Sequence, residues 1–138
     1  MKNLLLICLF SGMISCGNSD DNNQFLPNIP VNFTINLNLA EGIDLQVPGG
    51  SKVFANEGIR GIVVFRQNID VFVAFDLACP HIEIQNCSTM TVGSLFMTCP
   101  CDDQRFQLTD GAPENGNINE SARFYNVSLN GSILRISN

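Results

Sequence analysis

The chain has 138 residues, of which 45% are hydrophobic and only 14% are charged, and its formal net charge is −6 at pH 7. This apolar content suffices for one small globular domain with a single core and leaves no room for a second domain. The seven Lys and Arg residues are scattered along the sequence, which argues against a nucleic-acid partner and against a basic patch for a membrane surface.

The first fifteen residues have the features of a signal peptide. Lys2 precedes an apolar run at residues 4–14, which is too short to span a bilayer. The sequence Met-Ile-Ser-Cys at residues 13–16 resembles a bacterial lipobox, in which the cysteine is lipidated after cleavage. We therefore expect lipid on Cys16 and an extracytoplasmic protein anchored to the outer membrane of a Gram-negative bacterium, facing the periplasm or the cell surface.

Strand signals dominate the predicted domain at residues 31–138, which follows a polar stretch at residues 16–30 that is typical of a flexible, lipid-anchored tether. Residues 31–39 alternate apolar and polar side chains, which predicts a half-buried strand. Residues 59–65 and 71–75 are strongly apolar and predict a hairpin of buried strands. Further strands are expected at residues 95–98, 106–108, 124–129 and 133–136, the last two joined by a tight turn at Asn130 and Gly131. No window has a convincing helical period.

Two cysteine-containing loops are the strongest candidates for a functional site. The first has the sequence Cys-Pro-His at residues 79–81, and the second has Cys-Pro-Cys-Asp at residues 99–102. Thiolates together with an imidazole are typical ligands of a metal, and His81 is the only histidine in the chain. Each loop follows a predicted strand, so we expect the sheet to fix the position of both loops.

At these loops the sequence resembles the Rieske iron–sulfur family. That family has a Cys-x-His loop followed by a Cys-x-x-His loop, and the two loops hold a two-iron, two-sulfur cluster. Cys79 and Cys99 match the thiolate ligands of one iron, and His81 matches one imidazole ligand of the other. Asp102 stands where the family has its second histidine, and the spacing places it beside His81. The resemblance implies that these four residues bind the cluster.

The resemblance covers roughly residues 43–138. Phe106, the glycine–proline turn at residues 110–116 and the segment at residues 124–127 fall in family order. The resemblance implies an all-β, Rieske-like antiparallel sandwich or barrel with two cluster-type loops. In the quinol-oxidising branch of the family a disulfide clamps the two loops, and Cys87 and Cys101 occupy comparable positions.

The cysteine count leaves two pairings open. With one cysteine in the signal peptide and one lipidated, four remain in a compartment where disulfides persist. Either Cys79 and Cys99 hold metal while Cys87 and Cys101 form a disulfide, or all four cysteines form two disulfides and no metal binds.

The carboxylate of Asp102 allows three outcomes for the cofactor. If a cluster forms, the added negative charge lowers its potential below that of a centre with two histidines. A hard oxygen ligand suits such a cluster poorly, so the domain can instead have kept the fold and lost the cofactor. The third outcome is a single tetrahedral zinc ion bound by Cys79, His81, Cys99 and Asp102.

The predicted function is the transfer of single electrons to or from an unidentified redox protein. The sequence contains no nucleophile–base pair of a hydrolase and no additional catalytic domain, so we expect no independent catalytic site. The alternative is a cluster-free, disulfide-stabilised structural or binding lipoprotein that keeps the Rieske fold.

Overall fold

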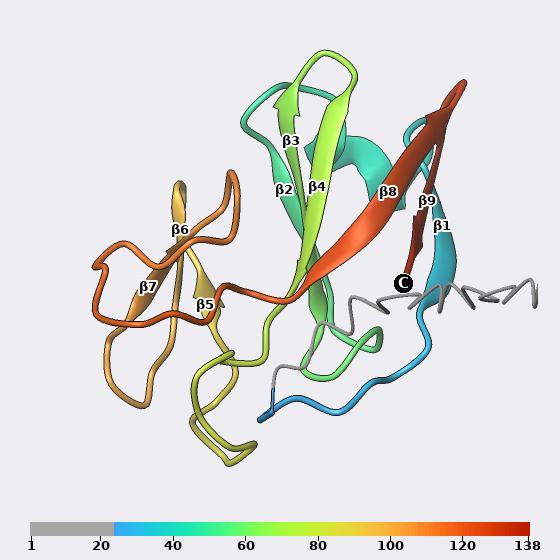
Figure 1. The fold of residues 1–138 in the computed structure, drawn as a ribbon. Helices are drawn as coiled ribbons and strands as arrows, with labels where there is room; N and C mark the ends of the chain where they lie inside the picture. The colour runs from blue at the N-terminus through green and yellow to red at the C-terminus, as the bar shows by residue number, and fades with distance from the viewer. Residues whose placement is uncertain (1–23) are drawn as a thin grey trace, which may run out of the picture.

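The computed structural model describes residues 24–138, which form two antiparallel sheets and one short 3₁₀ helix (Figure 1). The larger sheet has six strands in the order β1-β9-β8-β4-β3-β2, and the smaller has three in the order β5-β6-β7. The larger sheet contains β1 (Asn32–Asn36), β2 (Ser51–Phe54), β3 (Ile62–Asn68), β4 (Val71–Asp76), β8 (Phe124–Asn130) and β9 (Ile133–Ser137). The smaller sheet contains β5 (Thr91–Val92), β6 (Phe96–Thr98) and β7 (Arg105–Gln107). The predicted all-β, antiparallel fold is confirmed.

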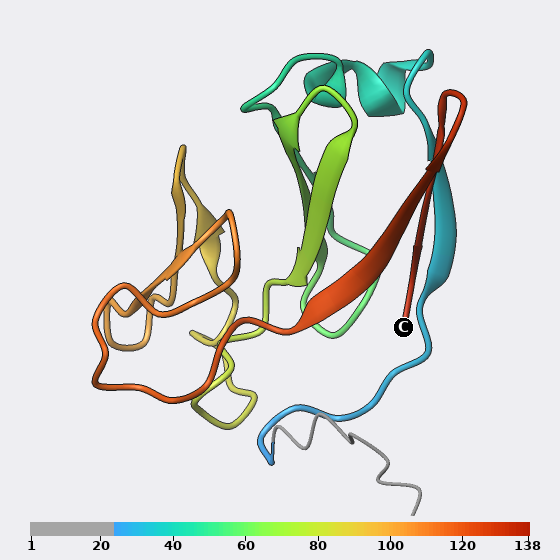
Figure 2. The same cartoon turned by 45° about the horizontal axis from the view of Figure 1, so that its top comes forward.

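The larger sheet is strongly curved because its middle pairing is short. Strands β4 and β8 pair only through Ala74 with Tyr125 and Phe75 with Phe124, so the β2-β3-β4 half and the β8-β9-β1 half diverge beyond these residues. Figures 1 and 2 show the two halves enclosing a common interior, with the smaller sheet standing beside the β2-β3-β4 half.

The predicted strand at residues 31–39 ends earlier than its alternation indicates. Strand β1 stops at Asn36, and the 3₁₀ helix η1 (Ala40–Leu45) follows after a turn. The turn depends on Gly42, because a Cβ atom there would lie 2.5 Å from the Cα of Leu37. The predicted extension to Leu39 is therefore wrong, and Leu39 is exposed at the turn.

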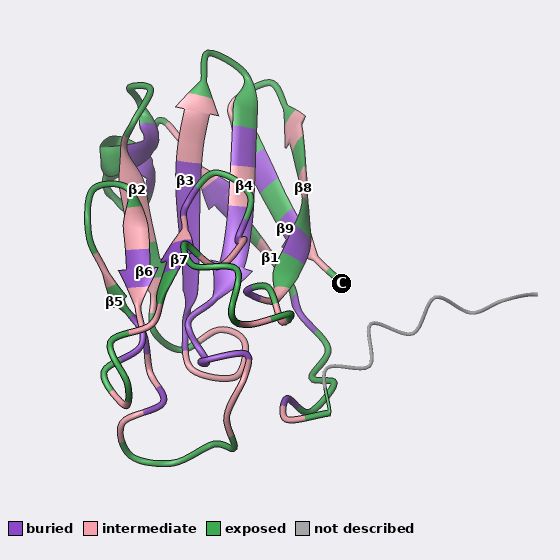
Figure 3. Cartoon of the chain, turned by 60° about the vertical axis from the view of Figure 1, so that its left-hand side comes forward, coloured by how far each residue is buried: buried purple, intermediate pink, exposed green. Residues whose placement is uncertain are grey.

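The side chains of β3 alternate between two cores. Ile62 and Val64 lie in the core enclosed by the larger sheet, whereas Val63 and Phe65 lie in a second core under the smaller sheet. All four are buried, and Figure 3 shows buried bands along β3 and β4, the one on β4 interrupted by a half-buried position. The second core is the one that contains cysteines, so the candidate loops are built on the face of β3 that looks towards the smaller sheet.

Residues 24–30, the described part of the predicted tether, lie along the domain. Leu26 is buried, and the guanidinium of Arg123 donates a hydrogen bond to the carbonyl of Pro27. The side-chain amide of Asn138 donates to the carbonyl of Ile29 at 2.8 Å. The predicted signal peptide and the lipidation site at Cys16 lie outside the described residues.

Candidate functional site

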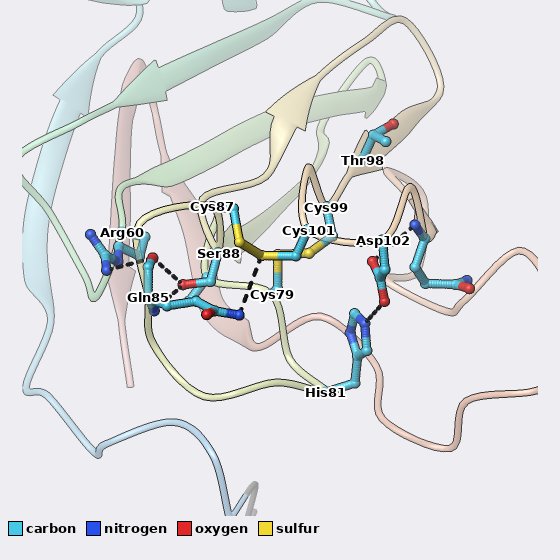
Figure 4. The surroundings of a disulfide bond; sticks show 12 residues. Arg60, Cys79, His81, Gln85, Cys87, Ser88, Thr98, Cys99, Cys101 and Asp102 are labelled. Atoms are coloured by element: carbon cyan, nitrogen blue, oxygen red, sulfur yellow. Dashed lines mark hydrogen bonds and ion pairs between the residues drawn. A yellow bond between two sulfur atoms is a disulfide. The ribbon is translucent and has the colours of Figure 1, made fainter.

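The first loop connects β4 to β5 and folds back on itself. The backbone N–H of Cys79 donates to the carbonyl of Ser88 at 2.9 Å, and an isolated bridge pairs Ala78 with Thr89. These contacts bring the two ends of the loop together below the smaller sheet. His81 lies on the part of the loop that faces the second loop (Figure 4).

The second loop is a tight turn between β6 and β7. The N–H of Cys99 donates to the carbonyl of Gln104 at 2.8 Å, and the N–H of Asp103 donates back to the carbonyl of Cys99 at 2.9 Å. Asp103 has a φ of 61°, in the left-handed region that aspartate tolerates better than most residues. The turn places Asp102 at its exposed tip and leaves Cys99 buried.

A buried carboxylate anchors the start of the first loop. Asp76 accepts hydrogen bonds from the backbone N–H groups of Ile59, Arg60 and Ala78 and from the hydroxyl of Tyr125. Burial, together with the Asp76 charge, raises the pKa of Tyr125 above its ordinary value, so its hydroxyl remains a donor. The one signal for Asp76 in the sequence is its position as an acid at the end of an apolar strand.

Both pairs of cysteines form disulfides. Cys79 and Cys99 are joined, with an S–S distance of 2.11 Å and a Cα–Cα distance of 5.7 Å. Cys87 and Cys101 are joined with a Cα–Cα distance of 5.1 Å, as the resemblance implies. The first bridge is fully buried in the second core, beside Met97, whereas the second is half-buried. The structure therefore has the two-disulfide pairing.

His81 and Asp102 form a hydrogen-bonded pair beside these bridges. Nε2 of His81 lies 2.6 Å from Oδ2 of Asp102, and the side chains are 9% and 42% exposed respectively. Partial burial raises the pKa of Asp102, but hydrogen bonds from His81 and from the N–H of Gln104, with the charge of His81, lower it to a net value below the ordinary 3.8. Asp102 is therefore an ionised acceptor at neutral pH, and Nε2 carries the hydrogen of this bond.

Comparison with protein families identifies the fold. The family model described as the Rieske [2Fe-2S] domain matches residues 39–126, a span that contains both loops and both disulfides. The chain belongs to the Rieske family. In the members that give the family its description, the domain carries a two-iron, two-sulfur cluster.

Solved structures similar to this Rieske domain include three bacterial proteins. The ferredoxin of carbazole 1,9a-dioxygenase from Nocardioides aromaticivorans IC177 is 23% identical, with 79% of this chain and 97% of that chain covered and a TM-score of 0.48. A putative NADH-dependent nitrite reductase small subunit from Mycobacterium tuberculosis is 19% identical, with coverages of 80% and 97% and a TM-score of 0.47. The E. coli protein NirD is 19% identical, with coverages of 70% and 90% and a TM-score of 0.43. Likenesses of this degree do not indicate a shared function. No curated protein matches the chain.

The residues as they stand do not fit the family's cluster. The sulfurs of Cys79 and Cys99, which the resemblance assigns to one iron, are bonded to each other. The resemblance assigns His81 and Asp102 to the other iron, but Nε2 of His81 and Oδ2 of Asp102 are hydrogen-bonded at 2.6 Å. Two nitrogen or oxygen ligands of one tetrahedral metal lie about 3.3 Å apart. His81, Cys99 and Asp102 do gather, with one ligand atom each within 4.8 Å of the others. The fold therefore brings together the residues that the sequence predicts, but they are bonded to one another by a disulfide and a hydrogen bond.

Proposed function

We propose that this chain is a cluster-free Rieske-fold lipoprotein with a structural or binding role outside the cytoplasm. The observation that carries the proposal is the buried Cys79–Cys99 disulfide, because it occupies both thiolates that a cluster needs. In this role the bridge replaces the cluster as the covalent link between the two loops.

The small size of the loop region explains why two bridges are useful there. Strands β5, β6 and β7 have only two or three residues each, so backbone pairing alone holds the region weakly. The bridges join residues that are 20 and 14 positions apart, and closing loops of this length stabilises a fold by about 3 kcal/mol each in the chain-entropy model. Small secreted domains commonly rely on such links.

The location follows from the N-terminal sequence and is part of the proposal. The apolar run at residues 4–14 and the lipobox-like sequence before Cys16 support export and lipid anchoring in the outer membrane of a Gram-negative bacterium. The paired cysteines are consistent with an oxidising compartment. Within residues 24–138, no helix is long and apolar enough to cross a membrane.

The second candidate function is that of a one-electron carrier for an unidentified redox protein, with a two-iron, two-sulfur cluster. The match of the Rieske [2Fe-2S] domain to residues 39–126 favours it. This function requires Cys79 and Cys99 as free thiolates, so the redox state of these two cysteines distinguishes the candidates.

Metal content and thiol accessibility of the full-length lipoprotein test the proposal. The protein is extracted anaerobically from membranes in detergent, without added thiol, and its iron, acid-labile sulfide and alkylated cysteines are measured. A colourless protein without iron, in which Cys79, Cys87, Cys99 and Cys101 all resist alkylation until reduced, is expected. About two irons and two sulfides per chain would instead establish the carrier. Cys87 and Cys101 serve as the internal control, because both candidates keep them bridged.

A further inference from the structure

One ring nitrogen of His81 makes no hydrogen bond to any residue that the structure describes. The side chain is only 9% exposed, and Nδ1 is buried without a partner among the described residues. Buried polar atoms are normally paired, because removing them from water without a new hydrogen bond is unfavourable. The unpaired Nδ1 is therefore an atom to which a further group can bind.

Asp102 determines which nitrogen of His81 is left free. An ionised carboxylate only accepts hydrogen bonds, so Nε2 donates to Asp102 and, in the neutral ring, Nδ1 keeps its lone pair. A histidine that binds a metal through one nitrogen commonly donates the other N–H to a carboxylate, which fixes the tautomer and the ring orientation. His81 and Asp102 have this relationship.

The sulfurs of the buried bridge are potential metal ligands close to His81. Ligand atoms of His81, Cys99 and Asp102 all lie within 4.8 Å of one another, and the sulfur of Cys79 is bonded to that of Cys99. Figure 4 shows His81 and Asp102, which come from different loops, on the same side of the paired sulfurs. Two sulfurs and one imidazole are thus already gathered in one buried place.

We propose that reduction of the Cys79–Cys99 disulfide opens a binding site for a single zinc ion, with the thiolates of Cys79 and Cys99 and Nδ1 of His81 as ligands. Asp102 is the positioning residue that holds the His81 ring. The inference rests on the proposed function, because a resident cluster would occupy the same two thiolates.

The reaction needs a dithiol reductant, which is a protein or small molecule with two thiols. Two successive exchanges break the Cys79–Cys99 bond, leave both cysteines as thiols and form one disulfide in the reductant. Zinc binding then displaces the two thiol protons into solvent and forms two Zn–S bonds. Exchange with a disulfide-containing protein or small molecule restores the Cys79–Cys99 bridge, releases the ion and leaves two thiols in the exchange partner.

The donor set selects zinc among the common divalent cations. Two soft thiolates and an imidazole favour zinc over calcium and magnesium, which prefer oxygen ligands. Ligands at zinc distances of about 2.0–2.3 Å lie about 3.3–3.8 Å apart, so the sulfurs must separate from 2.11 Å while the loops otherwise stay in place. Three protein ligands leave the fourth position for water.

Zinc titration of the full chain, oxidised and fully reduced, tests the inference. The reduced, iron-free protein is expected to bind one zinc ion per chain in competition with a chromogenic chelator, and the oxidised protein none. Cobalt substitution gives an independent signature, because thiolate ligation produces intense charge-transfer absorption. Reduced protein that binds no zinc, or oxidised protein that binds it equally well, would overturn the inference.

Matched variants identify the ligands. Reduced Cys87→Ser/Cys101→Ser is expected to keep zinc binding, whereas reduced Cys79→Ser/Cys99→Ser and His81→Ala lose it. Asp102→Asn is expected to weaken binding by about 10- to 100-fold, the usual effect of removing a carboxylate that orients a ligating histidine, with the cobalt–thiolate bands retained. Circular dichroism monitors folding, and His81→Ala, which leaves all four cysteines in place, decides the case if a cysteine variant fails to fold. Zinc binding unchanged in His81→Ala would contradict the assignment.

The two proposals fail in different ways. Iron and sulfide in the protein as extracted from membranes would contradict the cluster-free function, whatever the zinc titration shows. A colourless, iron-free protein that binds no zinc after reduction would leave the cluster-free function standing and remove the zinc site alone.

Discussion

The hydroxyl of Tyr125 donates a 2.8 Å hydrogen bond to Oδ2 of Asp76, and this bond joins the two halves of the larger sheet where their backbone pairing is shortest. Asp76 ends β4 and begins the first loop, while Tyr125 lies near the start of β8. Both residues are almost completely buried. The bond therefore couples the curvature of the sheet to the position of the loop that carries Cys79.

Tyr125→Phe is expected to destabilise the fold by about 1–3 kcal/mol, because it leaves an oxygen of the buried Asp76 carboxylate with one donor fewer. Urea unfolding of the oxidised protein measures the loss. Ser128→Ala, at an exposed position on the same strand, is the control and should change stability by less than about 0.5 kcal/mol. Equal effects of the two changes would mean that the buried bond is unimportant.

Asp102→Asn is expected to lower stability at neutral pH and to have no effect in strong acid. The folded-state pKa of Asp102 lies below the ordinary 3.8, so its ionised form stabilises the fold fully above that value. The contribution disappears as the pH falls through the lowered folded-state pKa. Unfolding of wild type and variant from about pH 7 to about pH 2 should give curves that converge at the acid end.

Asp103→Asn is the matched control for that experiment. Asp103 is the exposed neighbour of Asp102, and asparagine tolerates its left-handed backbone conformation equally well. Its unfolding curve should follow that of the wild type across the pH range. A constant gap between wild type and Asp102→Asn down to the lowest pH would show that the charge of Asp102 is not the cause.

Removing the buried Cys79–Cys99 disulfide should lower the free energy of unfolding more than removing the half-buried Cys87–Cys101 disulfide. Each bridge is expected to contribute about 3 kcal/mol through the unfolded chain, but Cys79→Ala/Cys99→Ala also leaves space in the second core. Urea unfolding should therefore rank this variant below Cys87→Ala/Cys101→Ala. The reverse order would indicate that the second core relaxes around the missing sulfurs.

Gly42→Ala is expected to destabilise the turn after β1 by about 1–3 kcal/mol. The added Cβ would meet the backbone of Leu37 at 2.5 Å and that of Asn36 at 2.6 Å, and neither atom can move without disturbing β1. Gly116→Ala is the control, because no atom of residues 24–138 lies within 4 Å of its added Cβ. Thermal unfolding distinguishes the two, and similar melting temperatures would contradict the close approach.

Cys16→Ser is expected to move the protein from the membrane to the soluble fraction without altering the domain. Lipid attachment needs the cysteine, whereas the described domain begins beyond it. Labelling of cells with a radioactive fatty acid, followed by membrane fractionation, checks both effects. Retention of label or of membrane association in the variant would locate the anchor elsewhere.

Strands with strong local patterns were predictable from the sequence. The apolar runs at β3 and β4 and the turn at residues 130–131 identify two hairpins that the structure contains. The end of β1 was not predictable, because apolar alternation continues to Leu39. It is decided by the backbone approach at Gly42, which joins segments that no local pattern relates.

The sequence was sufficient to predict which residues lie together in the candidate site, but it was not sufficient to predict which cysteines are joined. The spacing places His81 beside Asp102, and the structure joins them at 2.6 Å. Cysteine connectivity cannot be deduced from sequence alone, so the two-disulfide pairing needed the folded geometry. The roles of Cys79, His81, Cys99 and Asp102 in metal binding remain predictions that the reduced protein can test.

Because the side chains of β3 alternate between two cores, substitutions in this strand affect both cores. Adjacent residues such as Val63 and Val64 belong to different cores. If the strand moves away from one core to make room for a larger side chain, it moves into the other core. Substitutions of the buried β3 residues should thus be poorly tolerated. The residues of the two loops can change more easily than those of β3, because β3 is held between two cores and supports both loops.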